Sequence, residues 1–291
     1  MARAPGTRAV VVLLATLLAV AHPTPAAAQS DEAPWLRDRG PGIPMSQFGV
    51  YAEKGQFLIY PFFEYYYDSN LEYEPGEFGF GTGSAAIEEY RGKYRANEGI
   101  LFLGYAFSDR LAIEMEAAVI SAEFTKSATD TTTGLPSPHK ESGLGDVEGQ
   151  IRYRFNRETA SKPEYFTYFE TVFPTGEENS LIGTSVWELK LGGGFIKGFG
   201  FGTLTVRAGV DWDSGDKVFG IGEYAVEYLR RLSPHFRVFF MLEGSEDELS
   251  AVPEVQWHIS RNVFVKANAG FGVTSKATDF APEVGVMIAL P

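Results

Sequence analysis

The chain of 291 residues contains no cysteine and only four histidines. A disulfide scaffold is therefore excluded as a means of stabilisation, and zinc sites of the usual kind have few possible ligands. Positive charge is also scarce, because 25 lysines and arginines stand against 38 aspartates and glutamates, giving a net charge of −13. A chain so poor in basic residues is unsuited to nucleic acid, and no nucleic-acid partner is expected.

Long hydrophobic runs are almost absent, and the one that exists, Ala9–Ala21, lies at the N-terminus. It is shorter than the ~20 residues that a spanning helix needs. Arg3 and Arg8 precede it, and two prolines and the small residues Ala26–Ala28 follow. This layout predicts a cleavable signal peptide over residues 1–28 that exports the chain through the inner membrane.

Alternation of apolar and polar residues is abundant after residue 57. In Thr203–Trp212, Leu204, Val206, Ala208, Val210 and Trp212 alternate with Thr203, Thr205, Arg207, Gly209 and Asp211. Successive side chains of a strand point to opposite faces, so such a strand has one oily face and one charged face. Leu111–Val119, Val147–Phe155, Trp187–Phe195, Val263–Val273 and Val284–Leu290 follow the same scheme. Phe57–Asp68, Glu98–Phe107 and Tyr165–Phe173 are apolar on both faces, which leaves their facing open.

The strand candidates number about twelve, and their connections alternate in length. Short turns are expected at 108–109, 156–162, 198–200, 233–234 and 260–261, and longer loops at 69–92, 127–146, 174–185, 213–217, 244–250 and 275–280. Short periplasmic turns and long extracellular loops are typical of outer-membrane barrels. The predicted fold is all-β, a transmembrane antiparallel β-barrel over residues 57–291 in the cell outer membrane. Residues 29–56 are expected to form a periplasmic leader, too short for a folded plug domain but able to tuck into a pore.

Aromatic residues recur immediately before the short turns, as Phe107, Phe155, Phe195, Tyr228 and Trp257. Aromatic rings favour the membrane–water boundary, so these five predict one girdle. Phe124, Trp187 and Trp212, near the loop ends of their strands, are candidates for the other girdle.

The charged faces must point into the barrel, because lysine or arginine facing lipid costs ~2–4 kcal/mol at the midplane. The predicted lumen-lining residues carry both signs and are Glu114, Glu116, Glu148, Arg152, Arg154, Glu188, Lys190, Arg207, Asp211, Glu223, Glu227, Glu254, Lys266 and Glu283. They are expected either to line a solute path or to form a network of ion pairs that fills the barrel. The two possibilities stay open at this point.

Gly143–Asp146 has the sequence Gly-Leu-Gly-Asp and enters an alternating strand, and Phe173–Gly176 is Phe-Pro-Thr-Gly at a strand end. This pairing resembles the outer-membrane barrel family of the phenol-degradation meta-pathway, whose members are regarded as transporters. The resemblance implies a channel for small hydrophobic or aromatic compounds and carries over no substrate-binding residue. One departure is the C-terminus, since outer-membrane barrels usually end in an aromatic residue that the barrel-insertion machinery recognises, whereas this chain ends in Pro291.

The expected function is therefore passage of small organic solutes through an outer-membrane channel, with outer-membrane lipid and the insertion machinery as partners. Three alternatives are weighed against it, namely a non-conducting structural barrel, a lipid hydrolase in the barrel wall and a soluble periplasmic β-sandwich. His258 and Ser260 have a spacing that could pair a base with a nucleophile, but they lie at a predicted periplasmic turn, so no enzyme activity is expected. The acidic stretches Glu243–Glu248 and Asp211–Asp216 lack the calcium-loop spacing, and neither a metal nor a cofactor is expected.

Overall fold

A computed structural model describes residues 33–76, 78–80, 90–131, 133–176, 181–184, 186–215 and 217–291. The predicted signal peptide lies outside these residues. Twelve antiparallel strands form one closed barrel, which confirms the predicted fold class. The strands are β3 (Phe57–Tyr73), β4 (Tyr90–Ala106), β5 (Leu111–Thr125), β6 (His139–Asn156), β7 (Glu164–Phe173), β8 (Glu188–Phe199), β9 (Gly202–Asp213), β10 (Phe219–Arg231), β11 (Phe236–Ser245), β12 (Glu248–His258), β13 (Val263–Gly272) and β14 (Phe280–Leu290).

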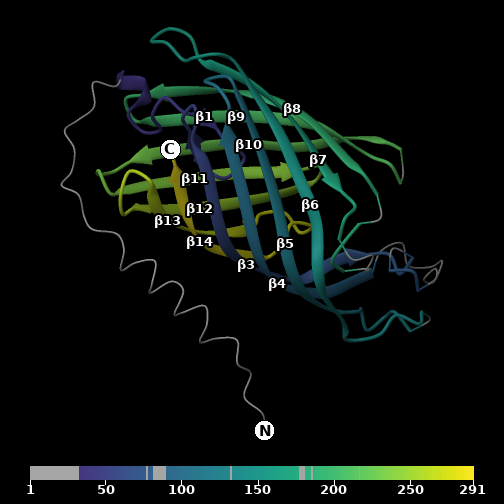
Figure 1. Ribbon diagram of the computed structural model, residues 1–291. Helices are drawn as coiled ribbons and strands as arrows, with labels where there is room; N and C mark the ends of the chain where they lie inside the picture. The colour runs from purple at the N-terminus through teal and green to yellow at the C-terminus, as the bar shows by residue number, and fades with distance from the viewer. Residues whose placement is uncertain are drawn as a thin grey trace.

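Each strand pairs with its neighbour in sequence, and β14 returns to pair with β3, so the sheet has no free edge. A sheet that crosses a membrane must close in this way, because lipid cannot hydrogen-bond an exposed strand edge. Figure 1 shows the short turns gathered at one end, beside the C-terminus, and the long excursions at the other. By the usual arrangement of such barrels, the first end is periplasmic and the second extracellular.

The outer surface is apolar, as the alternation predicts. Exposed side chains on alternate positions of neighbouring strands include Leu101, Met115, Val119, Ile151 and Val210. Aromatic rings gather at the periplasmic end in pairs, among them Tyr105 with Phe107, Tyr153 with Phe155, Tyr165 with Phe195, and Phe236 with Trp257. The band of exposed apolar side chains and the ring of aromatic pairs at its periplasmic end place the barrel in the outer membrane. Trp187 is exposed, whereas Phe124 is fully buried among Tyr73, Tyr90 and Leu135, so its assignment to the second girdle is wrong.

Several loops are shorter than the sequence predicts. Strand β3 continues to Tyr73, β4 starts at Tyr90 and β6 starts at His139. The barrel wall therefore extends further at the extracellular end of these strands. The segment 244–250, expected to be a loop, is a hairpin in which only Glu246 and Asp247 separate β11 from β12. Glu246 has a φ of 48°, the left-handed conformation that tight hairpin turns need.

Residues 33–56 precede the first barrel strand and pack against inward-facing side chains. They contain a short 3₁₀ helix, η1 (Pro34–Leu36), and a two-stranded ribbon, β1 (Ile43–Pro44) with β2 (Tyr51–Ala52). We call residues 33–56 the N-terminal segment. In Figure 1 its ribbon enters the barrel from the end that holds the short turns. No helix in the described part of the chain is long and apolar enough to cross a membrane.

Candidate functional site in the barrel lumen

The N-terminal segment fills much of the barrel interior with apolar side chains. Ile43, Met45 and Val50 are buried in one cluster with inward-facing residues of the wall, including Tyr60 and Phe102. Phe48 stacks on Phe239 at a centroid distance of 6.0 Å. At about 25 cal/mol per Å² of apolar surface removed from water, such contacts favour the docked position of the segment. Between the segment and the wall at Arg152, Phe166 and Arg207, only about 10 Å³ of space remains.

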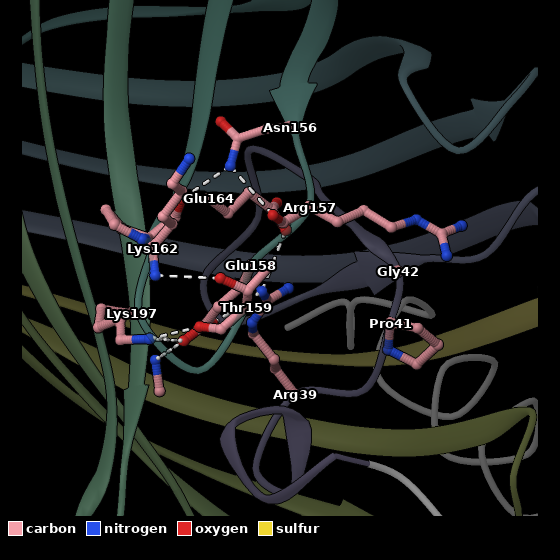
Figure 2. A network of polar contacts seen from close by, with 12 residues as sticks. Arg39, Pro41, Gly42, Asn156, Arg157, Glu158, Thr159, Lys162, Glu164 and Lys197 are labelled. Carbon is pink, nitrogen blue, oxygen red and sulfur yellow. Dashed lines mark hydrogen bonds and ion pairs between the residues drawn. The ribbon is translucent and has the colours of Figure 1, made fainter.

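A buried group of charges, which we call the anchor cluster, ties the segment to the wall (Figure 2). It consists of Arg39 from the segment with Arg154, Glu158, Glu164 and Lys197. The Arg39 Nη2 lies 3.2 Å from Glu158 Oε2 and 3.0 Å from Glu164 Oε2. All three side chains are essentially excluded from solvent. Burial acts to lower the pKa of Arg39, but Glu164 and Glu158 more than offset it, so its pKa lies above the ordinary value.

Arg154 links the same cluster to the backbone of the segment. Its guanidinium donates to the carbonyl oxygens of Gly42 at 2.8 Å and Pro41 at 3.2 Å, and lies 3.2 Å from Glu164 Oε2. Lys197 Nζ lies 3.0 Å from Glu158 Oε1. Each carboxylate therefore has two basic partners, which is what buried charges need to be tolerated.

Higher in the lumen, polar groups at the tip of the segment bind carboxylates of β5. The amide and hydroxyl of Ser46 both donate to Glu114 Oε2. Glu114 Oε1 lies 3.6 Å from the Nε of Arg152. Gln47 Nε2 donates to Glu116 Oε2 at 2.9 Å. Among the predicted lumen residues, Glu114, Glu116, Arg152 and Arg154 are thus brought together around the N-terminal segment.

A second group gathers around Arg207 on β9. Its guanidinium contacts the carboxylates of Glu223, Glu227 and Glu243. Lys190 Nζ lies 2.7 Å from Glu170 and 3.8 Å from Glu223. The members of this group lie on the five strands β7 to β11, so their ion pairs link these strands on the inner face of the barrel.

A third group surrounds Lys266, whose side chain is fully buried. Its Nζ lies 3.4 Å from both Glu254 Oε2 and Glu283 Oε1. The ring of Phe48 covers it at 4.5 Å from ammonium to centroid, a cation–π contact supplied by the N-terminal segment. Asn268 donates to Glu283 Oε2 at 2.9 Å.

A cavity of about 300 Å³ lies against the tip of the segment, and we call it the chamber. Its floor is formed by Ser46, Gln47 and Phe48. Four carboxylates and several rings contribute to its wall, namely Glu64, Glu116, Glu243, Glu283, Phe62 and Tyr66. No lysine or arginine is among the described residues that line it.

Several carboxylates at the chamber's level have no basic partner. Glu64 lies directly opposite Glu98 on β4 and Glu283 on β14, and Glu116 lies opposite Glu148 on β6. Within the described residues, no ion pair is formed by Glu64, Glu98, Glu116 or Glu148. Like charges directly opposite one another in a sheet are unfavourable. The carboxyl groups at this level therefore face one another with no described basic side chain between them.

The remaining predicted residues are placed differently. Glu188 and Asp211 lie near the extracellular ends of β8 and β9 and form no ion pair with another described residue. Glu148 lies on the inner face of β6 together with Arg152 but forms no ion pair with a described residue. Sequence reasoning missed Arg39, Glu158 and Glu164, which lie in segments without alternation, and Glu64 and Glu98, which lie in strands apolar on both faces.

The His258–Ser260 pair does not form a catalytic dyad in this structure. The ring of His258 stacks on Phe264 at 4.6 Å, and its Nε2 lies 3.3 Å from Gln256 Oε1. Ser260 Oγ accepts from the amide of Asn262. In the described ranges, no group of histidine, aspartate or glutamate has the arrangement of a metal site.

The two segments that carry the family resemblance contact each other where β7 ends, beside the extracellular half of β6. Asp146 Oδ1 accepts from the amide of Gly176 at 2.7 Å, and Thr175 Oγ1 accepts from the amide of Val147 at 3.1 Å. The other oxygen, Asp146 Oδ2, accepts from the amide of Thr184 at 2.6 Å. A Cβ on Gly176 would lie 2.7 Å from the backbone of Gly145, so glycine is required at this crossing. The two motifs are therefore parts of one structural unit.

No protein-family model and no curated protein matches this sequence. Among solved structures, the chain is similar to an outer-membrane channel from Pseudomonas putida F1, with 14% identity, a TM-score of 0.60, and coverage of 85% of this chain and 99% of that one. It also matches the transport unit of the autotransporter AIDA-I from Escherichia coli, with 9% identity, a TM-score of 0.46 and coverage of 96% and 97%. At such identities the first likeness shows the fold, which is that of an outer-membrane β-barrel.

Proposed function

We propose that the chain is an outer-membrane channel for passive movement of small organic solutes, with the N-terminal segment as the element that closes its lumen. The observation that carries this proposal is the chamber, a cavity of about 300 Å³ inside a closed barrel, bounded on one side by Ser46–Phe48. A purely structural barrel has no need of a cavity above a docked segment. Movement of residues 45–48 would join the chamber to the rest of the lumen.

The chamber's lining supports a class of solute. Carboxylates without basic partners favour cationic over anionic solutes, and the rings of Phe62, Tyr66 and Phe48 offer apolar contact. The resemblance to the phenol-degradation family also supports hydrophobic or aromatic compounds. We therefore propose that the channel passes small organic solutes and favours cationic over anionic ones. The inward-facing charged residues of the strands, such as Glu116, Arg152 and Lys190, line the solute path.

Locking the segment in place tests the proposal. The chain has no native cysteine, so Gln47→Cys with Glu116→Cys gives a unique pair at side chains that touch in the structure. Bridging the pair with a short bis-methanethiosulfonate linker is expected to reduce single-channel conductance in planar bilayers to the background level. Reduction of the linker is expected to restore it.

The control is the Gln47→Cys variant alone, treated with the same reagent, which cannot be bridged. Equal conductance before and after bridging of the double variant would show that ions pass without movement of the segment, and the closing role would be abandoned. Absence of conductance and of solute uptake in the unbridged protein would favour a structural barrel instead.

Neutralising the chamber is expected to weaken its preference for cations. In a water-like dielectric, a carboxylate ~6 Å from a passing ion contributes about 0.7 kcal/mol, a factor of about three. Each carboxylate repels an anion by the same factor, so at a pH where both groups are ionised the Glu64→Gln/Glu116→Gln variant should lower the cation-to-anion permeability ratio by up to about a hundredfold, measured from the reversal potential in a salt gradient. Glu53→Gln/Glu246→Gln removes the same charge at exposed sites outside the chamber and should leave the ratio unchanged. An unchanged reversal potential in the first variant would remove the chamber from the ion path.

A further inference from the structure

The outer wall carries a group of basic side chains near its extracellular end, which we call the basic patch. Arg91, Lys93 and Arg95 occupy successive outward positions of β4, and Lys140 lies on β6 two strands away. Outward and inward side chains alternate along β4 without a break. Gly92 and Ala96, at inward positions, are buried, and Leu101 is exposed on the same outer face as the patch. The side chains of Arg95 and Lys140 are 55% and 62% exposed.

The height of the patch can be estimated from the strand. Outward positions on β4 run from Tyr105, in the periplasmic girdle, through Leu103 and Leu101 to Arg95. Ten residues at about 3.3 Å per residue and a tilt of about 40° rise roughly 25 Å. The apolar band of such barrels is about 25 Å tall, so Arg95 lies at its outer boundary. Lys93 and Arg91 follow at the level of the outer-leaflet headgroups.

The neighbouring strand has the residues expected at this boundary. Tyr67 on β3 pairs directly with Arg95, and Tyr65 pairs with Asn97. Tyrosine rings are favoured where apolar chains meet headgroups. The wall thus changes within a few residues from aliphatic side chains to tyrosine and then to arginine and lysine.

Among the described residues, the carboxylates beside these cations are shared. Glu123 lies 2.6 Å from Arg95 and 2.8 Å from Lys140, so one carboxylate serves both. Glu72 likewise lies 3.0 Å from Arg91 and 3.5 Å from Lys276, which also pairs with Asp247. Lys93 has no ion-pair partner within the described ranges. Of the described outward-facing cations, Lys93 has no ion pair and Arg95 and Lys140 share one carboxylate, so this part of the wall offers positive charge to an external anion.

We propose that the basic patch binds a phosphate group on the glycolipid of the outer leaflet. Arginine and lysine are the side chains that bind phosphate oxygens, and basic groups at a membrane surface are attracted to anionic headgroups. The sugar-linked phosphate lies at the level of Lys93 while its acyl chains pack beside Leu101 and Tyr67. This role is independent of the channel, because the patch faces away from the lumen.

The test uses the full-length barrel in detergent, titrated with bisphosphorylated lipid A and followed by native mass spectrometry. The Lys93→Gln/Arg95→Gln/Lys140→Gln variant is expected to weaken lipid binding at least tenfold. The matched control, Arg110→Gln/Lys162→Gln/Arg261→Gln, removes the same charge at exposed periplasmic turns and should bind like the unmodified protein. A heat-modifiable gel shift verifies that each variant is folded.

Two further titrations identify the ligand. The unmodified protein is expected to bind dephosphorylated lipid A weakly, with the affinity that the patch variant has for lipid A. Millimolar inorganic phosphate is expected not to displace lipid A from the unmodified protein. Equal binding of lipid A by the patch variant and the control would overturn the proposal. Displacement by inorganic phosphate would also overturn it, by showing a site for the free anion.

Discussion

Replacement of Lys266 by methionine is expected to lower the free energy of unfolding of the barrel by about 3–5 kcal/mol, the usual cost of removing one partner from a buried ionic group. Glu254 and Glu283 would be left facing each other across β13 with no cation between them. The cation–π contact with Phe48 would be lost as well. Guanidinium unfolding of the detergent-solubilised barrel, followed by tryptophan fluorescence, measures the change.

A triple variant distinguishes the effect of unbalanced buried charge on stability from the effect of losing the packing of the Lys266 side chain. In Lys266→Met with Glu254→Gln and Glu283→Gln, the carboxylates are neutralised along with the cation. Because replacing a whole buried ionic group costs far less than breaking it, this triple variant should recover most of the stability. If the single variant unfolds within about 0.5 kcal/mol of the unmodified protein, the value typical of surface substitutions, Lys266 does not hold these strands together.

In the alternating segments, the sequence was sufficient to predict which face of the strand is polar, for a clear physical reason. Lipid tolerates only apolar side chains outside, so a segment such as Thr203–Trp212 must alternate. The count of strands follows from the same signal and is confirmed. Pairing among the charges could not be predicted, because it depends on register. Arg207 meets carboxylates on β10 and β11 that are 16, 20 and 36 positions away in sequence.

The strands with ambiguous facing are explained by the N-terminal segment. Phe57–Asp68 and Glu98–Phe107 are apolar on both faces because the outer face meets lipid and the inner face packs against Ile43, Met45 and Val50. A double apolar face in an otherwise alternating barrel was thus itself a sign of an occupied lumen. The position of residues 33–56 could not be predicted directly, since Arg39 and its partners Glu158 and Glu164 lie outside any periodic pattern.

Replacement of Arg39 by alanine is expected to raise the open probability of the channel at least tenfold. The change leaves Glu158 and Glu164 buried with one basic partner each, Lys197 and Arg154, instead of two. A loss of only 1.4 kcal/mol in docking free energy shifts the docked and undocked populations tenfold. Removing one partner from a buried ionic group typically costs more than that. Single-channel recording gives the open probability.

A second readout follows the segment itself. A cysteine introduced at Gln47 reports its release, because the chain offers no other thiol to a membrane-impermeant maleimide. Labelling should be faster with Arg39→Ala than without it, and Lys54→Ala, at an exposed position of the same segment, should change neither labelling nor conductance. Faster labelling with unchanged conductance would mean that the lumen is closed elsewhere. Unchanged labelling would mean that the apolar contacts of Ile43, Met45 and Val50 hold the segment without the anchor cluster. The anchor cluster is placed where the segment enters the lumen, so we expect the two measurements to change together.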